Sequence, residues 1–172
     1  KNVFKNKMER YMARSVAVNA ERSLPDRFKK EIKALSESSG VDYTDLMVFN
    51  CLGDLFNIGC STFTVSGKYS CDGKPIFARN LDFSAFGVAD KAGIIIVYKP
   101  EGKHAFAAVT FAGLSGTYSG MNEKGLAVAN MIVFNGHGGT NKTPIPSSLA
   151  FRQVLEECAT IKEAKEVLKK QG

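Results

Sequence analysis

Apolar side chains recur at the three- and four-residue spacing of amphipathic helices over roughly the first 58 residues of the chain. Proline and glycine divide this segment into three predicted helices. The first covers residues 4–23, and the second has Pro25 in its first turn and stops at Gly40, a typical C-terminal cap. The third opens at the N-cap residue Asp42 and continues to residue 55 or 56. The chain ahead of position 59 is therefore predicted to be helical.

Beyond position 59 the apolar pattern changes to the two-residue alternation of β-strands. Residues 60–66 and 74–83 alternate on either side of the turn signal Asp72-Gly73, so residues 60–80 are predicted to form an antiparallel hairpin. Further strands are expected over residues 93–100, 104–113, 116–121 and 124–134. About six strands result, which is enough for a whole antiparallel sheet.

The end of the chain returns to helical spacing after a predicted loop at residues 135–146, which is rich in Gly, Asn and Pro. Helices are predicted from Ser147 or Ser148 to residue 160 and over residues 161–170. This order of helices, strands and helices predicts a single α+β domain with helices against an antiparallel sheet. With 172 residues, of which 44% are hydrophobic, the chain is long enough to fill a core.

Composition argues against several classes of function. The net charge of +6 is densest in the first 33 residues, without a basic run interleaved with aromatics, so a solvated helical face is favoured over a nucleic-acid surface. The longest apolar runs are far shorter than the ~20 residues of a membrane-spanning helix. The cysteines are irregularly spaced and form no CxxC pair, so neither a zinc site nor a disulfide framework is indicated, and the sequence calls for no cofactor. They are Cys51, Cys60, Cys71 and Cys158.

Cys60 is the strongest candidate for chemistry, because Gly59 precedes it at the head of the first predicted strand. A small buried hydrophobe is the ordinary interpretation of such a cysteine. Gly59 lacks a Cβ, however, so the Cys60 thiol can approach the Gly59 carbonyl closely and attack it. Water would resolve the resulting thioester and leave Cys60 as a new N-terminal residue. Its α-amino group, with a pKa of about 8, and its thiol, with a pKa of about 8.5, could then exchange a proton without a histidine.

Arg79 and Asp82 lie at the far end of the second predicted strand. If the two strands pair, both residues return to the side of Cys60. The guanidinium would favour the thiolate and the carboxylate would hold the new ammonium group, whereas an ordinary salt bridge at a sheet end is the alternative. Asn130 is expected on the last strand, where its side-chain amide binds an oxyanion or simply hydrogen-bonds the strand end.

The remaining titratable candidates are weaker. His104 lies in a strand-like run and His137 in the glycine-rich loop, and a Cys-His thiol hydrolase using either one is the less favoured alternative. Cys51 on the third helix, Cys71 in the hairpin turn and Cys158 near a helix end are expected to be core or surface residues.

Three motifs in order resemble a known group of enzymes: Gly59-Cys60, the run "ARNLDF" and the run "GMNEKGLAVAN". The group is that of the isopenicillin N acyltransferases and choloylglycine hydrolases, which are N-terminal nucleophile hydrolases; acid ceramidase and the N-acylethanolamine amidases are similar more distantly. The likeness covers most of the chain. The acyltransferase branch carries a propeptide before the nucleophile, so residues 1–59 resemble that propeptide and residues 60–172 the N-terminal part of the hydrolase domain.

The resemblance implies an αββα sandwich, self-cleavage between Gly59 and Cys60, and hydrolysis or transfer of the acyl group of a small linear amide. It makes Cys60 the nucleophile and its amino group the base, with Arg79 and Asp82 positioning and tuning it. It also implies an oxyanion asparagine on the strand after the turn. Bile-salt members carry it two positions beyond Asn130, which has the same strand parity as that position.

Members of this group continue for a further half, which supplies the rest of the sandwich, another catalytic Asn and often a late Arg. We therefore expect the 172 residues to be a fragment with an incomplete second sheet. Exposed apolar sheet would favour association with another copy of the chain. The alternative function is that of an inactive or unprocessed relative that acts as a binding or assembly module.

Overall fold

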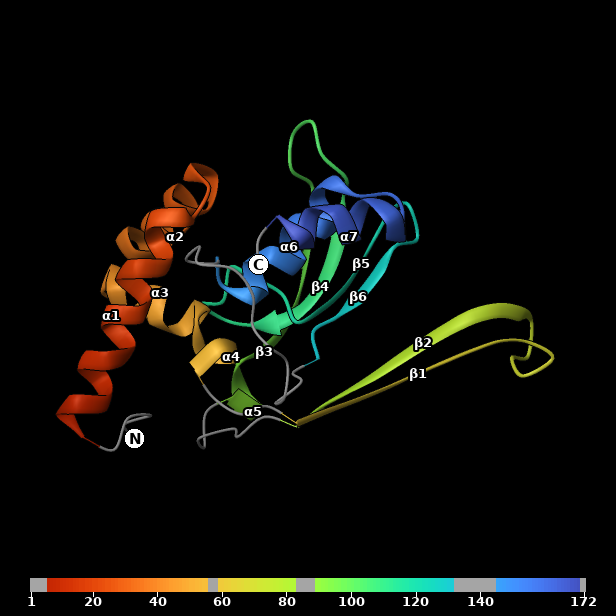
Figure 1. Cartoon of the computed structure of the whole chain (residues 1–172), viewed down its shortest axis with the longest axis horizontal. Helices are drawn as coiled ribbons and strands as arrows, with labels where there is room; N and C mark the ends of the chain where they lie inside the picture. The colour runs from red at the N-terminus through yellow and green to blue at the C-terminus, as the bar shows by residue number, and fades with distance from the viewer. Residues whose placement is uncertain (1–5, 56–58, 83–88, 132–144, 171–172) are drawn as a thin grey trace.

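The helices predicted ahead of the first strand form one side of the molecule in the computed structural model, which describes residues 6–55, 59–82, 89–131 and 145–170 (Figure 1). The described residues ahead of the first strand form four helices: α1 (Lys7–Ser23), α2 (Asp26–Ser39), α3 (Tyr43–Asn50) and α4 (Leu52–Leu55). Gly40 caps α2 in the left-handed conformation, and the Asp42 side chain caps α3 by accepting from the Asp45 backbone N–H.

Two details of the helical prediction are wrong. Pro25 is the N-cap of α2 and precedes its first turn, because its ψ of 139° is extended rather than helical. The third predicted helix is interrupted at Cys51, which ends α3, and the chain resumes as the short α4. The periodic apolar spacing continues across this break, so the sequence pattern alone did not reveal it.

A hydrophobic core joins the helical side of the molecule to the end of the chain. Small residues on α1 allow close packing, and larger residues of α2 and α3 fill the space beneath them. The core also takes in residues of α6 (Ser147–Glu157), so the helices at the two ends of the sequence pack together. Its fully buried members include Ala17, Phe28, Ile32, Met47 and Leu149.

The strands divide into two antiparallel sheets instead of the single sheet that six consecutive strands suggested. One has the order β3 (Gly93–Tyr98), β4 (Phe106–Phe111), β5 (Ser119–Asn122) and β6 (Ala127–Ala129), and the short helix α5 (Ala89–Ala92) leads into it. The other is the hairpin of β1 (Gly59–Gly67) and β2 (Gly73–Asp82). Alternation identifies a strand but carries no information about which strands pair, which is why the division was not predicted.

One face of the four-stranded sheet is covered by α6 and α7 (Ile161–Lys169), as Figure 1 shows. Phe106 and Ala108 of β4 pack against Leu155 of α6. The helix comes so close to β5 that a Cβ placed on Gly120 would lie 2.7 Å from Leu155 Cδ1. Helices on an antiparallel sheet confirm the predicted α+β class.

The opposite face of this sheet is open in the described part of the chain. Strand alternation directs Ile95, Val97, Val109 and Met121 to this face, and between 57% and 72% of each residue is exposed. We call these four residues the open face. A sandwich requires a second layer here, so the described residues supply only part of the predicted αββα arrangement.

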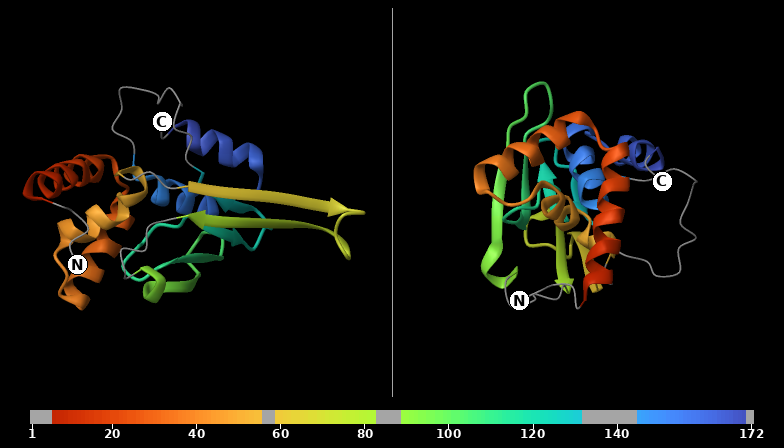
Figure 2. Two further views of the ribbon diagram at one scale, coloured as in Figure 1. Left: turned by 90° about the horizontal axis from the view of Figure 1, so that it is seen from below. Right: turned by 90° about the vertical axis from the view of Figure 1, so that its left-hand side faces the viewer.

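The hairpin of β1 and β2 projects away from the rest of the molecule, as Figures 1 and 2 show. Most of its residues are exposed, and the half-buried ones include Cys60, Arg79 and Leu81 near its base. Residues 68–72 connect the strands, so the turn is longer than the Asp72-Gly73 pair suggested. The end of the hairpin that carries Cys60 is therefore the end that meets the body of the molecule.

Strand β6 is shorter than predicted and leaves Asn130 just beyond its end. Of the expected loop at residues 135–146, only residues 145 and 146 are among the described residues. His137 lies outside them. None of the helices in the described ranges has the length and apolar character needed to span a bilayer.

Candidate active site

Cys60 and Arg79 meet at the base of the hairpin. Cys60 pairs with Leu81 across the hairpin, and Thr62 pairs with Arg79. Alternate residues of a strand share a face, so Cys60 and Arg79 project from the same side of the hairpin. The Arg79 Nη2 donates to the Cys60 Sγ over 3.2 Å. The structure thus places a fixed positive charge against the candidate nucleophile.

The same guanidinium connects the hairpin to the four-stranded sheet. Its Nη1 donates to the Ser119 Oγ of β5 over 2.8 Å, and its Nη2 also donates to the Asn130 carbonyl oxygen over 3.1 Å. The Nε is buried and has no hydrogen-bond partner among the described residues. None of the ion pairs between described residues includes Arg79, so its hydrogen bonds there are to a thiol, a hydroxyl and a carbonyl.

Asp82 lies beside the peptide bond that precedes Cys60. It pairs directly with Gly59 across the hairpin. A Cβ placed on Gly59 would lie 3.4 Å from the Asp82 Cβ and 3.6 Å from its Oδ2. The Asn80 Nδ2 donates to the Asp82 Oδ1 over 2.6 Å. Asn80 was not singled out from the sequence, although residues two apart on a strand share a face and its spacing to Asp82 was the available signal.

Asn130 approaches Cys60 indirectly, through its backbone. Its carbonyl accepts from Arg79, and its N–H donates to the Tyr118 carbonyl over 2.8 Å. Its side-chain Nδ2 donates to the Ser147 Oγ over 3.0 Å. The residue is buried, and among the described residues its side-chain amide donates to Ser147, the first residue of α6, and makes no hydrogen bond to Cys60.

Two contacts hold the short helix α4, which leads toward Cys60. The Gly53 N–H donates to the Tyr118 hydroxyl over 3.0 Å, and the Asp54 Oδ2 accepts from the Ser147 N–H over 3.1 Å. Burial raises the pKa of the Tyr118 hydroxyl well above its ordinary value, so the hydroxyl stays neutral. These partners were missed from the sequence, because the contacts join segments that are more than sixty residues apart.

The histidine alternative finds no support in the contacts of His104. Its Nδ1 lies 3.5 Å from the Glu123 Oε1, and its backbone N–H donates to the Glu156 carbonyl. Cys60 is instead in contact with Arg79.

The other cysteines differ from Cys60 in their surroundings. Cys51 is 1% exposed, and burial raises its pKa to about 12. Cys158 is also buried, whereas Cys71 is exposed in the connection between β1 and β2. All four cysteines are free thiols. Within the described ranges, no group of three or more His, Cys, Asp or Glu side chains is arranged to hold a metal ion.

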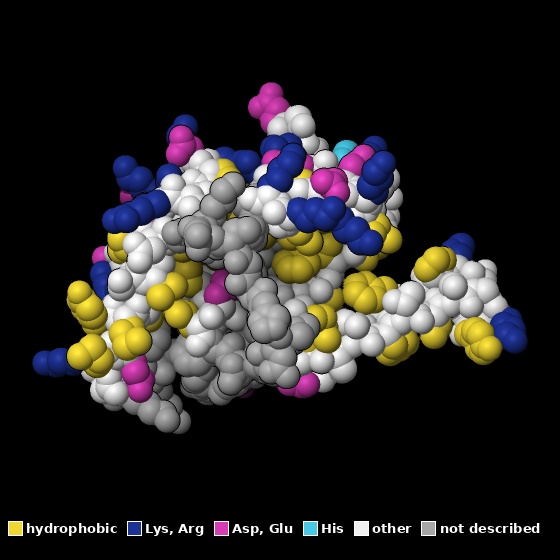
Figure 3. Space-filling view, viewed as in Figure 1, with side chains coloured by type: hydrophobic (Ala, Val, Ile, Leu, Met, Phe, Trp, Pro, Cys, Tyr) yellow, Lys and Arg dark blue, Asp and Glu magenta, His cyan; other side chains and the backbone are white. Residues whose placement is uncertain are grey.

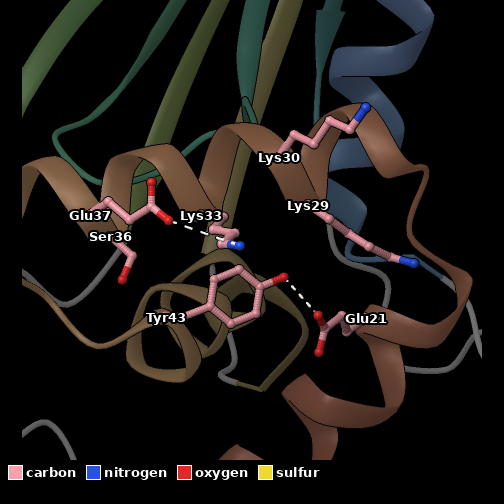
Figure 4. Close-up of a pocket in the computed structure, with 7 residues that line it drawn as sticks. All are labelled: Glu21, Lys29, Lys30, Lys33, Ser36, Glu37 and Tyr43. Carbon is pink, nitrogen blue, oxygen red and sulfur yellow. Dashed lines mark hydrogen bonds and ion pairs between the residues drawn. The ribbon is translucent and has the colours of Figure 1, made fainter.

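A separate surface hollow lies among α1, α2 and α3 (Figure 4). Tyr43 donates to the Glu21 Oε1 there over 2.8 Å, and Lys33 lies 4.0 Å from Glu37. The hollow is an open surface away from Cys60, so we assign it no role in the site.

Part of this chain matches a family of known proteins. Residues 69–172 match the sequence model of a family described as acyl-coenzyme A:6-aminopenicillanic acid acyl-transferase. The match covers more than half of the chain and includes Arg79, Asp82 and Asn130, but it begins after Cys60. The fold and this match place the chain in the class of N-terminal nucleophile hydrolases. The chain belongs to the acyl-coenzyme A:6-aminopenicillanic acid acyl-transferase family.

Individual relatives are more distant. Protein dcd1A of Dictyostelium discoideum is 23% identical in an alignment 150 residues long, which covers 81% of this chain and 34% of that protein. Acid ceramidase of Rattus norvegicus is 24% identical in an alignment 170 residues long, which covers 86% of this chain and 42% of the enzyme. The chain thus spans less than half the length of these curated relatives.

Proposed function

We propose that the protein is a self-processing cysteine hydrolase or acyltransferase that cleaves or transfers the acyl group of a linear amide. The observation that carries this proposal is the 3.2 Å contact between Arg79 Nη2 and the Sγ of Cys60, directly after Gly59 at the head of a strand. Membership of an acyltransferase family supports the class of reaction. Residues 1–59 act as the propeptide, and residues 60–172 form the N-terminal part of the hydrolase domain.

Self-cleavage activates the nucleophile. The Cys60 Sγ attacks the Gly59 carbonyl carbon, the peptide C–N bond breaks, and the nitrogen takes up the thiol proton. Water then hydrolyses the thioester, which leaves a carboxylate on Gly59 and a free amino group on Cys60. The absence of a Cβ on Gly59 and the position of Asp82 beside this peptide bond support the step, because the thiol can reach the carbonyl and the carboxylate can hold the new ammonium group.

Amide cleavage then uses the same sulfur. The α-amino group of Cys60 takes the thiol proton, and Arg79 stabilises the thiolate. The thiolate attacks the amide carbonyl of the substrate, and the protonated amino group delivers a proton to the departing amine. Water resolves the acyl thioester in a hydrolase, and another acyl acceptor does so in a transferase.

Asn130 serves this reaction as an oxyanion donor. A side-chain amide carries two N–H hydrogens, and the contact with Ser147 uses one of them. The second is available to a developing oxyanion, together with backbone N–H groups.

Mass spectrometry of the purified protein tests the proposal. We expect the intact chain to give way to two pieces, residues 1–59 and residues 60–172. Cys60→Ala should remain intact, because it removes the attacking sulfur, and Cys71→Ser should be cleaved like the parent, because Cys71 is exposed far along the hairpin. A parent chain that stays intact through long incubation, as Cys60→Ala does, would contradict self-processing.

An assembly module is the second candidate, and the open face favours it, since exposed apolar sheet commonly marks an interaction site. In that case we expect a continuous backbone through Gly59 and Cys60, with no labelling of Cys60 by a thiol-reactive acyl probe.

A further inference from the structure

We propose that Ser119 is a positioning residue that holds the Arg79 guanidinium against the Cys60 sulfur. The inference rests on the proposed role of Cys60 as nucleophile. Ser119 lies on a different sheet from both residues and was not a candidate in the sequence.

The hydrogen bonds of Arg79 show why a positioning residue is needed. Nη2 is shared between the Cys60 Sγ and the Asn130 carbonyl, whereas Nη1 has the Ser119 Oγ. The Nε has no partner in the described part of the chain. Among the described residues, Ser119 therefore accepts the one hydrogen bond that holds the Nη1 end of the planar guanidinium. Without it, the guanidinium can rotate about its bonds to the side chain and carry Nη2 away from the sulfur.

Ser119 is itself held rigidly, which a positioning residue requires. It pairs with Val109 of β4 on one side and with Ala129 of β6 on the other. The Thr117 hydroxyl also accepts from the Ser119 N–H over 3.2 Å and donates to the Ser119 carbonyl over 2.7 Å. Arg79, in contrast, extends from a hairpin that is largely exposed. The four-stranded sheet, through Ser119, therefore holds the Arg79 side chain in place.

The neutrality of Ser119 is the second part of the inference. A carboxylate at this position would hold the guanidinium equally well, but it would also offset the positive charge that favours the thiolate. A hydroxyl positions Arg79 and leaves its charge for the sulfur. Arg79 is thus held in place by a neutral partner, and no acidic side chain of the described ranges forms an ion pair with it. A positive charge placed in this way favours the reactive thiolate of a cysteine.

Alkylation of Cys60 by iodoacetamide tests the inference directly. In a Cys71→Ser background, Cys60 is the one thiol of the chain that is not buried. Because a guanidinium held against the sulfur favours the reactive thiolate, we expect Ser119→Ala to slow alkylation at pH 7 by about 3- to 10-fold. Ser119→Thr keeps the hydroxyl and should restore the rate to within about 2-fold of the parent.

Ser61→Ala is the matched control, because Ser61 adjoins Cys60 but faces the opposite side of the hairpin and is exposed. It should leave the alkylation rate unchanged. An unchanged alkylation rate in folded Ser119→Ala would overturn the inference.

A double-mutant cycle tests whether the effect passes through Arg79 even when single variants are weakened in folding. In an Arg79→Lys chain, which keeps the charge but lacks the fork, Ser119→Ala should have no further effect on alkylation. An equal loss of rate in both backgrounds would show that Ser119 acts elsewhere. Mass spectrometry of the same samples records self-cleavage separately, so a chain that is never cleaved but shows the Ser119 effect would remove the proposed function and leave this inference standing.

Discussion

Cys51 and Cys60 are nine positions apart, yet their surroundings give the same side chain opposite chemistry. Cys60 is half-buried and accepts a hydrogen bond from a guanidinium. Cys51 is almost fully buried at the end of α3, where burial, aided by the charge of Asp54, raises its pKa to about 12. The Cys51 thiol therefore stays protonated at neutral pH.

The raised pKa of Cys51 predicts a loss of stability in alkali. In the unfolded chain the thiol ionises at about pH 8.5, whereas in the folded chain it stays protonated up to about pH 12. The stabilisation is complete below the unfolded pKa and is lost as the pH rises toward the folded one, with a slope of up to about 1.4 kcal/mol per pH unit.

Urea unfolding at a series of pH values between 8 and 10 measures this slope. Cys51→Ala should show a shallower decline than the parent, even though the cavity it leaves lowers its stability at every pH. Cys71→Ser should follow the parent, because Cys71 is exposed in the folded protein. Parallel slopes for the parent and Cys51→Ala would contradict the assignment.

The sequence predicted the positions of Arg79 and Asp82 because both depend on local geometry. A hairpin with a nearby turn must bring residues 79 and 82 back to residue 60, whatever the rest of the fold does. Ser119 and Ser147 could not be predicted in this way. Their contacts depend on how the hairpin, the sheet and α6 pack together, and a lone serine carries no spacing signal.

At the scale of whole elements, an almost fully buried arginine of α6 joins this helix to α2. Arg152 is nearly buried, and its two terminal nitrogens donate to the two carboxylate oxygens of Glu31 on α2 over 2.6 and 2.7 Å. Its Nε donates to Glu156 over 2.9 Å, and its guanidinium lies 4.4 Å from the centre of the Tyr98 ring. Because Glu31 precedes the proposed cleavage point and Arg152 follows it, this contact joins the two pieces.

Removal of this arginine should therefore weaken the attachment of the helical segment. We expect Arg152→Met to lower the free energy of unfolding by about 2–4 kcal/mol, since it leaves the buried Glu156 with one fewer partner. In a cleaved sample, size-exclusion chromatography should show residues 1–59 separating from residues 60–172.

Arg22→Met provides the comparison, because Arg22 is an exposed residue of α1. This variant should stay within about 0.5 kcal/mol of the parent and keep the two pieces together. Equal stability of the two variants would mean that apolar packing alone holds the helices to α6.

Element boundaries were predicted where a residue imposes a local conformation and were missed where packing decides. Gly40 ends α2 because its φ of 72° is left-handed, a conformation that glycine adopts readily. The break at Cys51 and the early end of β6 have no comparable signal. The Asn130 N–H still donates to Tyr118 in the register of the β5–β6 pair, but its carbonyl accepts from Arg79, which lies far away in the sequence.

For the whole molecule, two apolar surfaces lack a cover among the described residues. One is the open face of the four-stranded sheet. The other is a face of the hairpin formed by Phe63, Val65, Ile76 and Ala78, which strand pairing places together, and Figure 3 shows hydrophobic side chains along this projection. An isolated hairpin is marginally stable in water, and exposed apolar patches of this kind commonly mark contact surfaces.

A second copy of the chain is the cover that we expect for both surfaces. The hairpin projects away from its own sheet, so the hairpin face of one copy can cover the open face of the other in a two-fold arrangement. A stable interface buries more than about 1,000 Å² in total, so each of the two identical contacts needs to bury about 500 Å². We therefore expect a dimer in analytical ultracentrifugation.

Phe63→Ser combined with Ile76→Ser should shift the protein to the monomer, because both side chains are substantially exposed on the hairpin face. Val18→Ser is the control, since Val18 is 45% exposed on α1, away from both surfaces, and its loss should leave the sedimentation coefficient unchanged. A parent protein that sediments as a monomer at high micromolar concentration would rule out the second copy as the cover. A dimer that persists in the double hairpin variant would show that the copies associate through a different surface.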